Sequence, residues 1–402
     1  MPTERLYYLH SYVKDFTARV LTATPLANGQ YALVLDRTAF YPASGGQPAD
    51  HGWLADIPVI DVREQGGDIV HITAGCPEAP SVSGRIDWQR RFDHMQQHSG
   101  EHVLTGAFHQ VMNAHNIGFH LGETSSQLDL DVEALTAEQI TAVETVANTR
   151  VFANLPIHIH IVDAAELSRF PLRKQPAKQY DRLRLIEVPA FDCCPCGGTH
   201  VGTTGEIGLI KIRTWERKKN GVRIDFVCGL RALTDYQAKN ETVKNLAAAL
   251  SVPPAEVKAA YDKQLLRLDT LTKDLAAAQQ ELCGRLARDL HAQAARAGDL
   301  KIITHTLTNA LPAAVGELAR ECAGYEQTVA LIAGISPDNT KVHLVFAASP
   351  ALTPAVPLNA LLKTALPFID GKGGGSPQLA QGGGSNPAGA LAALATAKDL
   401  LL

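Results

Sequence analysis

The sequence predicts a multidomain α+β protein, in which a small N-terminal β-barrel is followed by an α+β domain, a long connecting helix and a C-terminal α/β domain. Three observations predict this class. The 402 residues exceed the length that usually forms one hydrophobic core. Short strand-like runs fill residues 14–88, and further strands then alternate with helices without a strict βαβ series. Residues 256–296 contain no proline and only one glycine, which is typical of a long helix.

Composition narrows the class of protein. Apolar residues make up 46% of the chain and charged residues 19%, as in most globular proteins. No apolar run reaches the roughly 18 residues of a membrane span, and the N-terminus lacks the apolar core of a signal peptide. We therefore expect no membrane segment, and the seven cysteines, three of them clustered, favour a reducing cytoplasm. The formal net charge of −4 gives no overall signal for a nucleic-acid partner.

Residues 1–88 are expected to form the barrel domain. Four runs in this part are rich in apolar and β-branched residues: ARVLTAT, QYALVLD, GWLADIPVIDVRE and DIVHITA. The pairs Asn28-Gly29 and Gly66-Gly67 separate such runs and are typical of tight turns. Several short strands joined by turns indicate a small barrel.

Residues 89–235 are expected to form an α+β domain around a group of histidines. The stretch HSGEH, residues 98–102, lies in a proline-free segment whose apolar residues recur at helical spacing. Residues four apart share one helix face, so His98 and His102 can converge on one metal ion, and His94 lies one further turn away. A polar helix face with incidental spacing is the alternative for this stretch alone.

A second pair of candidate ligands occurs later in the same domain. In the stretch DCCPCGGTHVG, Cys196 and His200 flank two glycines that allow a tight turn, so a thiolate and an imidazole can point the same way. With the two helical histidines they make a set of nitrogen and sulfur donors, which favours Zn²⁺ over Ca²⁺ or Mg²⁺. Cys193 and Cys196 also form a Cys-x-x-Cys pair, and a redox pair is the competing interpretation.

A cluster of cations follows in the stretch KIRTWERKKNGVR, which contains an Asn-Gly turn and therefore predicts a β-hairpin. Its basic residues are Lys211, Arg213, Arg217, Lys218, Lys219 and Arg223. A hairpin gathers these charges on one ribbon close in sequence to Cys196 and His200. A hairpin whose charges are only solvated is the alternative.

Residues 236–299 are expected to form a helical linker. The stretch SVPPAE ends one helix, and Pro254 is placed to begin the next. Apolar residues then follow at seven-residue intervals: Tyr261, Leu268, Leu275 and Leu282. This spacing indicates a coiled coil, which would make a homodimer. A helix that lies on its own domain is the alternative.

Residues 300–402 return to strand-like and helix-like runs around a glycine-rich segment, GKGGGSPQLAQGGG at residues 371–384. This segment is not a Walker A loop, because no Gly-Lys-Ser/Thr follows the required spacing. Glycines at this density form a loop whose backbone N–H groups can approach an anion or an RNA backbone, with a helix N-terminus following. A flexible linker is the alternative.

Four motifs together resemble a known family. TAFYPASGGQPADHG (38–52), HSGEH (98–102) and CGGTHV (196–201) are similar to the editing region of alanyl-tRNA synthetase and of its free-standing relatives, the AlaX-type alanyl-tRNA editing proteins. The glycine-rich segment is similar to the C-terminal domain that alanyl-tRNA synthetase shares with DHH phosphoesterases. The resemblance covers nearly the whole chain. The aminoacylation domain of the synthetase has no counterpart in this sequence. The resemblance therefore implies the long form of the free-standing editor, with a C-terminal domain of the DHH-associated type.

The resemblance implies roles for individual residues. The zinc ligands that it implies are His98, His102, Cys196 and His200. The residues expected to bind the substrate are Thr38, Gly45, Gly46, Gln47 and His94. The residues expected to contact tRNA are Lys218, Arg223, Gly371, Lys372, Gly373, Gly374 and Gly375. Glu101 departs from the family pattern, where relatives often carry an uncharged residue, and no catalytic residue is assigned.

The implied activity is cleavage of the aminoacyl ester of tRNA(Ala) that carries serine by mistake, with glycine as a second candidate amino acid. A site that hydrogen-bonds the serine hydroxyl can reject the alanyl ester, because alanine would leave a polar group unpaired. Thr38 is the first candidate for this contact and Gln47 the second. An ordinary β-branched strand residue is the alternative interpretation of Thr38.

The sequence is also compatible with other functions. A non-catalytic tRNA-binding factor that keeps zinc for folding is one, and a deacylase for another seryl-tRNA such as Ser-tRNA(Thr) is a second. Four protein ligands usually mark a closed structural zinc site, whereas catalytic zinc keeps an open position, so the sequence leaves the role of zinc undecided. A phosphoesterase is disfavoured, because the metal-binding Asp-His-His domain of that superfamily has no counterpart here.

Overall fold

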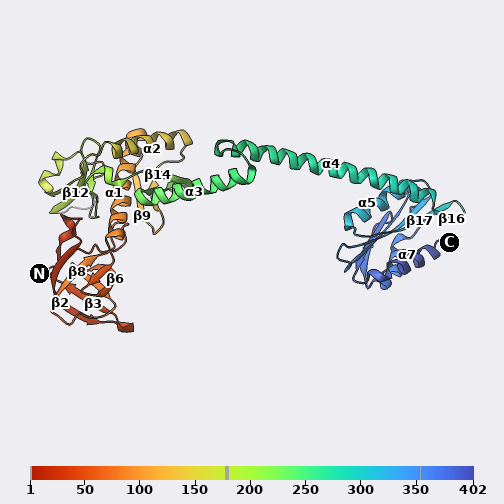
Figure 1. Ribbon diagram of the computed structural model, residues 1–402, viewed down its shortest axis with the longest axis horizontal. Coiled ribbons are helices and arrows are strands. Elements are labelled where there is room, and N and C mark those ends of the chain that lie inside the picture. The colour runs from red at the N-terminus through yellow and green to blue at the C-terminus, as the bar shows by residue number, and fades with distance from the viewer. Residues whose placement is uncertain (1, 177–180, 354) are drawn as a thin grey trace. The chain divides into compact units, whose positions relative to one another are not determined.

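The computed structural model describes residues 2–176, 181–353 and 355–402. The chain divides into two compact units, residues 1–246 and 247–402, and each is described by itself (Figure 1). Helices and several separate sheets occur along the chain, which confirms the predicted multidomain α+β class.

Six strands of the first unit close into a barrel in the order β2-β3-β7-β6-β5-β8. Their bounds are β2 Asp15–Pro25, β3 Tyr31–Leu35, β5 Gly52–Leu54, β6 Ile57–Gln65, β7 Asp68–Thr73 and β8 Ser81–Ile86. Alternate residues of a strand point to opposite faces, so Leu33, Leu35 and Ile69 fill the interior. A short parallel pair, β1 (Glu4–Arg5) and β4 (Arg37–Thr38), leads toward the loop that carries Ser-Gly-Gly-Gln.

Helix α1 (Trp88–Met112) is the central element of the rest of the first unit. Asp87 caps its N-terminus by accepting a hydrogen bond from the backbone N–H of Arg90, and Asn113 ends it in the left-handed conformation. Every residue from 94 to 108 is buried. Because the helix is covered on all sides, its polar side chains are held in fixed positions.

The elements around α1 are one helix and two sheets, of strand order β14-β15-β10-β9 and β11-β12-β13. Their bounds are β9 Asn116–Leu121, β10 Ser126–Leu130, α2 Ala137–Phe152, β11 His158–Asp163, β12 Arg182–Val188, β13 Asp192–Pro195, β14 Ile210–Lys218 and β15 Gly221–Cys228. Apolar side chains of α1, α2 and the four-stranded sheet form one core. The predicted basic hairpin is β14 and β15.

A buried ion pair joins the barrel to α1. The guanidinium of Arg91 donates to both carboxylate oxygens of Asp50 and to the carbonyl oxygen of Ser11 at 2.8 Å. Both charged side chains are fully buried. Removing one partner of such a pair costs about 3–5 kcal/mol, because the other charge is left without compensation. The pair therefore fixes the barrel and its Ser-Gly-Gly-Gln loop relative to the histidines of α1.

The second unit contains the long helix α4 and a six-stranded sheet of order β16-β17-β18-β19-β21-β20, in which only β17 and β18 are parallel. The helices are α3 Gly229–Leu250, which crosses the boundary, α4 Val257–Ala292, α5 Pro312–Ala323, α6 Leu358–Ala365 and α7 Ala390–Asp399. The strands are β16 Ala295–Ala297, β17 Leu300–Leu307, β18 Thr328–Ile335, β19 Val342–Ala348, β20 Lys372–Gly375 and β21 Leu379–Gly384.

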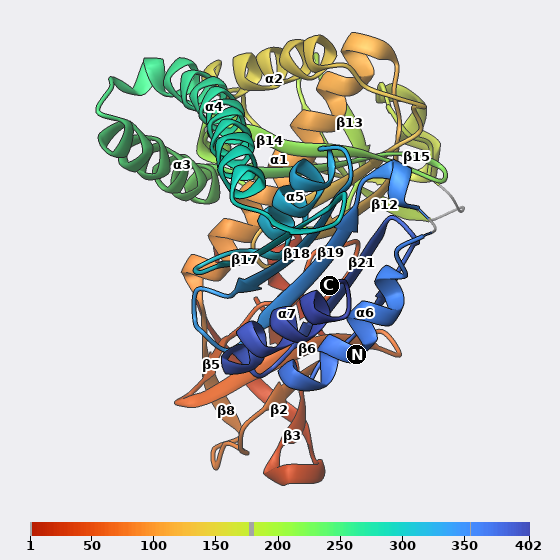
Figure 2. The ribbon, with the colours of Figure 1, turned by 90° about the vertical axis from the view of Figure 1, so that its right-hand side faces the viewer.

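The sheet of the second unit has a separate core on each face. In β18, Val329 and Leu331 pack with α6 and α7, whereas Ala330 and Ile332 pack with α5 and the end of α4. Figure 2 looks onto the face that α6 and α7 cover. This arrangement agrees with an α/β layer structure at the C-terminus.

The predicted long helix is present as α4. Its residues Tyr261, Leu268, Leu275 and Leu282 are 54% to 66% exposed. Along this apolar stripe α4 therefore does not pack against its own domain, which was the alternative to a coiled coil. Among the described residues, no helix combines the length and the apolar character needed to cross a membrane.

The glycine-rich segment differs from the loop that we expected. It forms the hairpin of β20 and β21 at the edge of the sheet, and a turn at residues 387–389 separates it from α7. A Cβ atom at Gly373 would lie 2.3 Å from the carbonyl oxygen of Gln381, and one at Gly384 would lie 1.9 Å from that of Ile369. Close approach of neighbouring backbone therefore explains glycine at these two positions: a strand of the same sheet at Gly373, and the short helix of residues 366–369 at Gly384.

Candidate metal and substrate site

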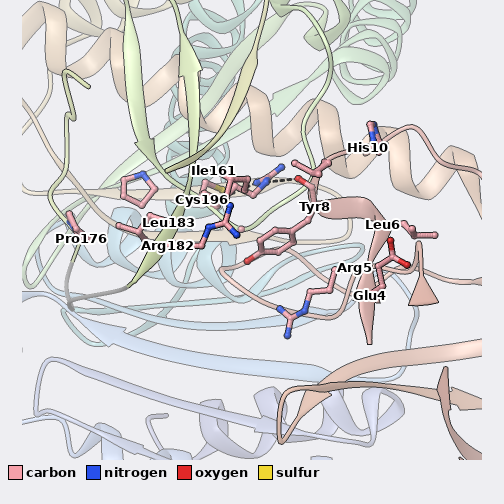
Figure 3. A pocket seen from close by; sticks show the side chains of 14 residues that line it. Glu4, Arg5, Leu6, Tyr8, His10, Ile161, Pro176, Arg182, Leu183 and Cys196 are labelled. Carbon is pink, nitrogen blue, oxygen red and sulfur yellow. Dashed lines mark hydrogen bonds between the residues drawn. The ribbon is translucent and has the colours of Figure 1, made fainter. Parts of the chain in front are cut away.

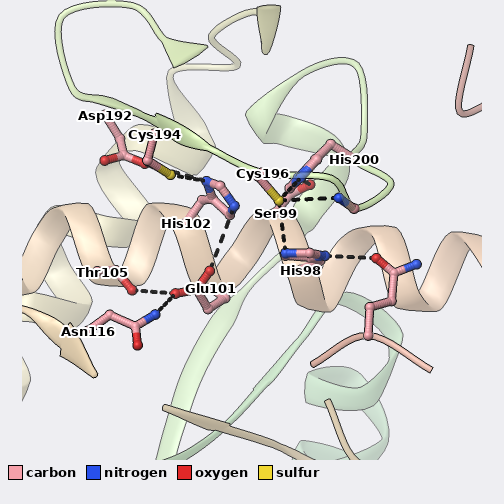
Figure 4. A network of polar contacts seen from close by, with 12 residues as sticks. His98, Ser99, Glu101, His102, Thr105, Asn116, Asp192, Cys194, Cys196 and His200 are labelled. Carbon is pink, nitrogen blue, oxygen red and sulfur yellow. Dashed lines mark hydrogen bonds and ion pairs between the residues drawn. The ribbon is translucent and has the colours of Figure 1, made fainter. Parts of the chain in front are cut away.

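The four predicted ligands lie together. His98 and His102 come from α1, and Cys196 and His200 come from the turn after β13, with their ligand atoms all within 4.8 Å of one another (Figure 4). Sγ of Cys196 lies 3.4 Å from Nε2 of His98 and 3.3 Å from Nε2 of His200. We call these four residues the metal cluster.

The donor set and its spacing fit zinc. Imidazole nitrogen and thiolate sulfur are the donors that zinc takes in proteins, with Zn–N of about 2.0 Å and Zn–S of about 2.3 Å. In a tetrahedral site these lengths separate nitrogen from sulfur by about 3.5 Å. The two sulfur–nitrogen distances in the metal cluster are close to this value. The side chains are also buried or half-buried, so a bound ion would compensate donors that water does not reach.

The turn between Cys196 and His200 requires glycine. A Cβ atom at Gly198 would lie 2.1 Å from Cε1 of His98 and 3.0 Å from Oε1 of Gln47. At Gly197 it would meet only the hydroxyl of Tyr8, at 3.8 Å. Gly198 is therefore required by the approach of the turn to α1, whereas Gly197 has room for a side chain.

One hydrogen bond sets the tautomer of His98, and another orients the ring of His200. The side-chain oxygen of Gln47 lies 2.8 Å from Nδ1 of His98, so this nitrogen must carry the proton and Nε2 is left as an acceptor for a cation. The same amide donates to the hydroxyl of Thr199 at 2.8 Å. Oγ of Ser99 lies 3.1 Å from Nδ1 of His200, whose Nε2 faces Cys196. Both rings therefore present Nε2 to the cluster.

The cluster favours a thiolate at Cys196. Burial by itself would raise the pKa of Cys196, but His98, His200 and His102 outweigh burial and hold the pKa well below its ordinary value. Burial lowers the pKa of His200 to about 3, so this ring is neutral. A thiolate with a neutral imidazole is the protonation state that zinc binding needs.

A second group of polar side chains surrounds His102. Its Nδ1 lies 3.5 Å from a carboxylate oxygen of Asp192 and 3.4 Å from Sγ of Cys194. The Nε atom of Arg173 donates to Asp192 at 2.6 Å. Burial acts to lower the pKa of His102, but Cys194, Cys196 and Asp192 outweigh it and raise the pKa well above its usual value. The Asp192 carboxylate and the Cys196 thiolate would also stabilise a metal cation at this ring.

Sequence reasoning missed Asp192, Cys194 and Arg173 as neighbours of the site. Asp192 and Cys194 lie just before the CGGTH motif in the sequence. A carboxylate four residues before Cys196 was the available sequence signal for a neighbour of the metal, and the structure shows that it is buried. Arg173 lies in a segment without a recognisable motif. Only the fold brings it to Asp192.

Glu101 is buried and faces the site. It is 4% exposed, and its Oε1 accepts hydrogen bonds from Oγ1 of Thr105 at 2.7 Å and from Nδ2 of Asn116 at 2.6 Å. Its other oxygen lies 3.8 Å from Nε2 of His102. Glu101, which departs from the family pattern, therefore does not face solvent.

A cavity of about 460 Å³ opens at the metal cluster. Its lining includes His98, His102, Cys196, Glu101, Asn116, Phe119, Gly45 and Gly198. The neighbouring Gly46 has φ of +85°, and a Cβ atom there would lie 2.5 Å from the carbonyl oxygen of Phe119. The Ser-Gly-Gly-Gln loop thus packs against β9 and contributes to the wall of the cavity. We call it the cluster cavity.

Thr38 and His94 lie outside the lining of the cluster cavity. The hydroxyl of Thr38 is fully buried in the barrel, 2.8 Å from Nε2 of His71, and accepts from the backbone N–H of Phe40. His94 is outside the group of ligand atoms, and burial, followed by Arg90, lowers its pKa to about 3. Neither side chain is among the described residues that line the cluster cavity.

None of the residues expected to contact tRNA belongs to the metal cluster or lines the cluster cavity. Arg223 makes two hydrogen bonds to the carboxylate of Asp129, at 2.7 and 2.8 Å, and Lys218 pairs with Glu216. The residues Gly371, Lys372, Gly373, Gly374 and Gly375 lie in the second unit, at the exposed edge of its sheet. The cluster cavity is therefore built without either group.

The redox interpretation of Cys193 and Cys196 finds no support. Cys193 packs in an apolar group with Val162 and Leu185, and burial raises its pKa to about 12. All seven cysteines are free thiols. Cys193 is thus a core residue, whereas Cys196 faces the histidines.

Comparisons with known proteins agree with this geometry. Residues 183–224 match the family described as the threonyl and alanyl tRNA synthetase second additional domain. The alanyl-tRNA editing protein AlaX-L of Pyrococcus horikoshii is 28% identical over 396 residues, 94% of each chain. The alanyl-tRNA editing protein Aarsd1-B of Xenopus laevis is 34% identical over 270 residues, and the match spans 66% of either chain, just under two thirds.

Full-length synthetases are also similar. The alanine–tRNA ligase of Pyrobaculum neutrophilum is 38% identical over 267 residues, which make up 62% of this chain and 29% of the ligase. The solved C-Ala domain of Aquifex aeolicus alanyl-tRNA synthetase aligns with 27% of this chain at 25% identity, covering 96% of that domain, with a TM-score of 0.25 that does not define a fold. The chain is thus similar over nearly its whole length to an AlaX-type alanyl-tRNA editing protein, and over part of theirs to alanine–tRNA ligases.

Proposed function

We propose that the chain is a trans-editing hydrolase that removes a wrongly attached amino acid from tRNA(Ala). The observation that carries this proposal is the metal cluster of His98, His102, Cys196 and His200 at the wall of the cluster cavity. The relatives named alanyl-tRNA editing proteins support it. The metal ion proposed for the metal cluster is Zn²⁺. The proposed place of action is the cytoplasm.

The proposed substrate is Ser-tRNA(Ala), with Gly-tRNA(Ala) as a second. An alanine pocket rejects serine and glycine poorly, so a separate hydrolytic site is needed. Two side chains are candidates for reading the serine hydroxyl. Gln47 touches His98, and Thr38 would have to exchange its bond to His71 for one to the substrate. The ratio of Ser-tRNA(Ala) to Ala-tRNA(Ala) hydrolysis in Thr38→Val and in Gln47→Leu tells which of them reads serine.

Glu101 is the proposed general base. In ester hydrolysis, water attacks the carbonyl carbon and passes a proton to a base, the bond from this carbon to the ribose oxygen breaks, and the ribose oxygen takes a proton. Glu101 is a buried carboxylate at the cavity wall, held in orientation by Thr105 and Asn116. Zinc, when bound, would supply positive charge beside the ester. The side chains of Phe119 and Tyr41 help to exclude bulk water from the cavity.

Contacts to the body of the tRNA are proposed for two regions. Lys218 and Arg223 of the β14–β15 hairpin belong to the first unit, and residues 371–375 belong to the second. Two weak contacts on one ligand can gain about 10²- to 10⁴-fold through effective concentration. Removing residues 300–402 should therefore weaken tRNA binding and flatten its salt dependence, yet leave hydrolysis at saturating tRNA intact.

The domain division is also a proposal: a barrel domain at 1–88, an editing domain at 89–235, a helical linker at 236–299 and a C-terminal domain of the DHH-associated type at 300–402. The exposed apolar stripe of α4 is the proposed contact of a homodimer. A truncated chain that keeps the half-saturation point and the salt slope of the full chain would leave dimerisation as the only role of the C-terminal part.

The deciding experiment is deacylation of Ser-tRNA(Ala) with and without a zinc chelator. We expect rapid hydrolysis by the zinc-loaded chain, slow hydrolysis of Ala-tRNA(Ala), and loss of activity on metal removal. The second candidate function is a non-catalytic tRNA-binding factor, favoured by four protein ligands, which usually mark a structural zinc site. Binding of tRNA without any hydrolysis would establish this second function.

A further inference from the structure

A second cavity, of about 790 Å³, lies next to the cluster cavity (Figure 3). The two cavities share Pro176, Pro195, Cys196 and Gly197 in their linings. The other lining residues come from the N-terminal segment, from β11 and from β12, and they include Arg5, Tyr8, His10, Arg182 and Arg184. We call it the arginine cavity. It is as large as many small-ligand sites, and it reaches the thiol of the metal cluster.

Arg184 has an unused donor in this cavity. The residue is 5% exposed, and its Nε and one terminal nitrogen donate to the carbonyl oxygens of Tyr8 at 2.8 Å and Cys196 at 2.7 Å. The other terminal nitrogen, Nη2, is buried and has no hydrogen-bond partner among the described residues. A buried donor left unpaired costs free energy, so an acceptor that reached this nitrogen from the cavity that Arg184 lines would be stabilised.

The ring of Tyr8 adds an aromatic surface to the cations. The guanidinium of Arg184 lies 5.4 Å and that of Arg5 lies 5.8 Å from the ring centroid. Arg182, two residues before Arg184 at the start of β12, has a largely exposed side chain whose Nε lies 3.4 Å from a carboxylate oxygen of Asp163. Glu4 is the one carboxylate of the described lining, and it pairs with Arg37. The lining is therefore cationic around an aromatic ring.

This combination is suited to a single-stranded nucleotide. Proteins bind unpaired nucleotides by stacking bases on aromatic rings and by donating to phosphate and ribose oxygens from arginine. We propose that the arginine cavity binds the unpaired 3′-terminal nucleotides of tRNA, with a base on Tyr8 and a phosphate or ribose oxygen on Arg184. The inference rests on the proposed function, because the ester is carried by the last nucleotide and must reach the metal cluster.

The test measures binding, not hydrolysis. Zinc-loaded full-length protein is titrated, by fluorescence anisotropy, into an uncharged acceptor-stem hairpin with its unpaired 3′ end and into the same hairpin without that end. Tyr8→Ala should weaken binding of the tailed hairpin about 5- to 150-fold and leave the blunt hairpin unchanged. Tyr8→Phe keeps the stacking surface and should bind as the wild type does. Tyr236→Ala, at an exposed tyrosine of α3 outside the cavity, is the matched control.

A second variant tests the cation. Arg184→Met removes the charge. The plot of log binding constant against log salt has a negative slope, and for the tailed hairpin this slope should become shallower by about 0.7. Because Arg184 also holds the carbonyl of Cys196, zinc content and thermal unfolding of this variant are measured alongside. If it does not fold, Tyr8→Ala decides.

The outcomes separate this inference from the proposed function. Equal affinity of wild type and Tyr8→Ala for the tailed hairpin overturns the inference, even where Ser-tRNA(Ala) is hydrolysed. A tail-dependent loss of binding in Tyr8→Ala supports the inference, even where no tRNA ester is cleaved.

Discussion

The side-chain oxygen of Gln47 lies 2.8 Å from Nδ1 of His98, although the two residues are 51 positions apart in the chain. Gln47 ends the Ser-Gly-Gly-Gln loop of the barrel domain, and His98 is a proposed zinc ligand on α1. The bond therefore links the barrel to the metal cluster. It also fixes the tautomer that leaves Nε2 free for a metal.

Gln47→Leu should weaken zinc binding about 10- to 100-fold, because a ligating histidine loses the partner that orients it. Competition with a chromogenic chelator measures the affinity. Gln47→Glu keeps an acceptor oxygen at this place and should retain most of it. Equal affinity of Gln47→Leu and wild type would show that the bond does not matter for metal binding.

Gly198→Ala should also weaken zinc binding, since its Cβ atom would lie 2.1 Å from the ring of His98 and displace it. Gly197→Ala is the matched control, because the nearest atom to its Cβ would be 3.8 Å away, an ordinary contact. We expect the control to bind zinc as the wild type does. Equal zinc affinity of the two variants would contradict the packing described here.

Cys196→Ala should lose most of the bound zinc, measured by elemental analysis of the purified protein. Cys194→Ala and His94→Ala should keep it. Cys194 deserves the comparison because it forms, with His102 and Asp192, a second group of potential ligands. Zinc lost from Cys194→Ala but kept by Cys196→Ala would place the metal in that second group.

Glu101→Gln should lower kcat for Ser-tRNA(Ala) about 10²- to 10⁴-fold, the usual effect of a general base, with zinc content unchanged. Glutamine can still accept the hydrogen bonds from Thr105 and Asn116, so it keeps the local structure. Single-turnover hydrolysis and KM measured together separate chemistry from binding. An unchanged kcat would remove Glu101 from the proposed mechanism.

The stability of the first unit should depend on pH through His71. Burial lowers the pKa of His71 to about 4 from the ordinary 6.5. Between these values the unfolded chain binds a proton that the folded chain does not, so stability present above about pH 6.5 is lost as pH falls to about 4. The loss is about 3 kcal/mol.

Urea unfolding followed by tryptophan fluorescence measures this effect, because Trp53, Trp88 and Trp215 all lie in the first unit. His71→Gln should lose less stability than the wild type over the same pH range, even though it changes the bond to Thr38. Identical pH dependence in the two proteins would show that His71 is not the group that titrates.

The sequence by itself determined the local features of this protein. The spacing of His98 and His102 puts both rings on one helix face, and the glycines before His200 permit the turn that Cys196 needs. The strand runs before residue 88 and the proline-free stretch of α4 were likewise predictable. Such features depend on neighbours within a few residues, and propensity and periodicity report those neighbours directly.

The tertiary structure decided what these features touch. It brought the hydroxyl of Thr38 into hydrogen-bond distance of His71 and the carboxylate of Asp192 close to His102. It also brought the guanidinium of Arg184 to the carbonyl oxygen of Cys196, to which it donates. It also turned the glycine-rich segment into a sheet edge, because β19, from an earlier part of the chain, pairs with β21 of the β20–β21 hairpin. These contacts join residues far apart in sequence, and their energies depend on burial and on close packing that no local pattern encodes.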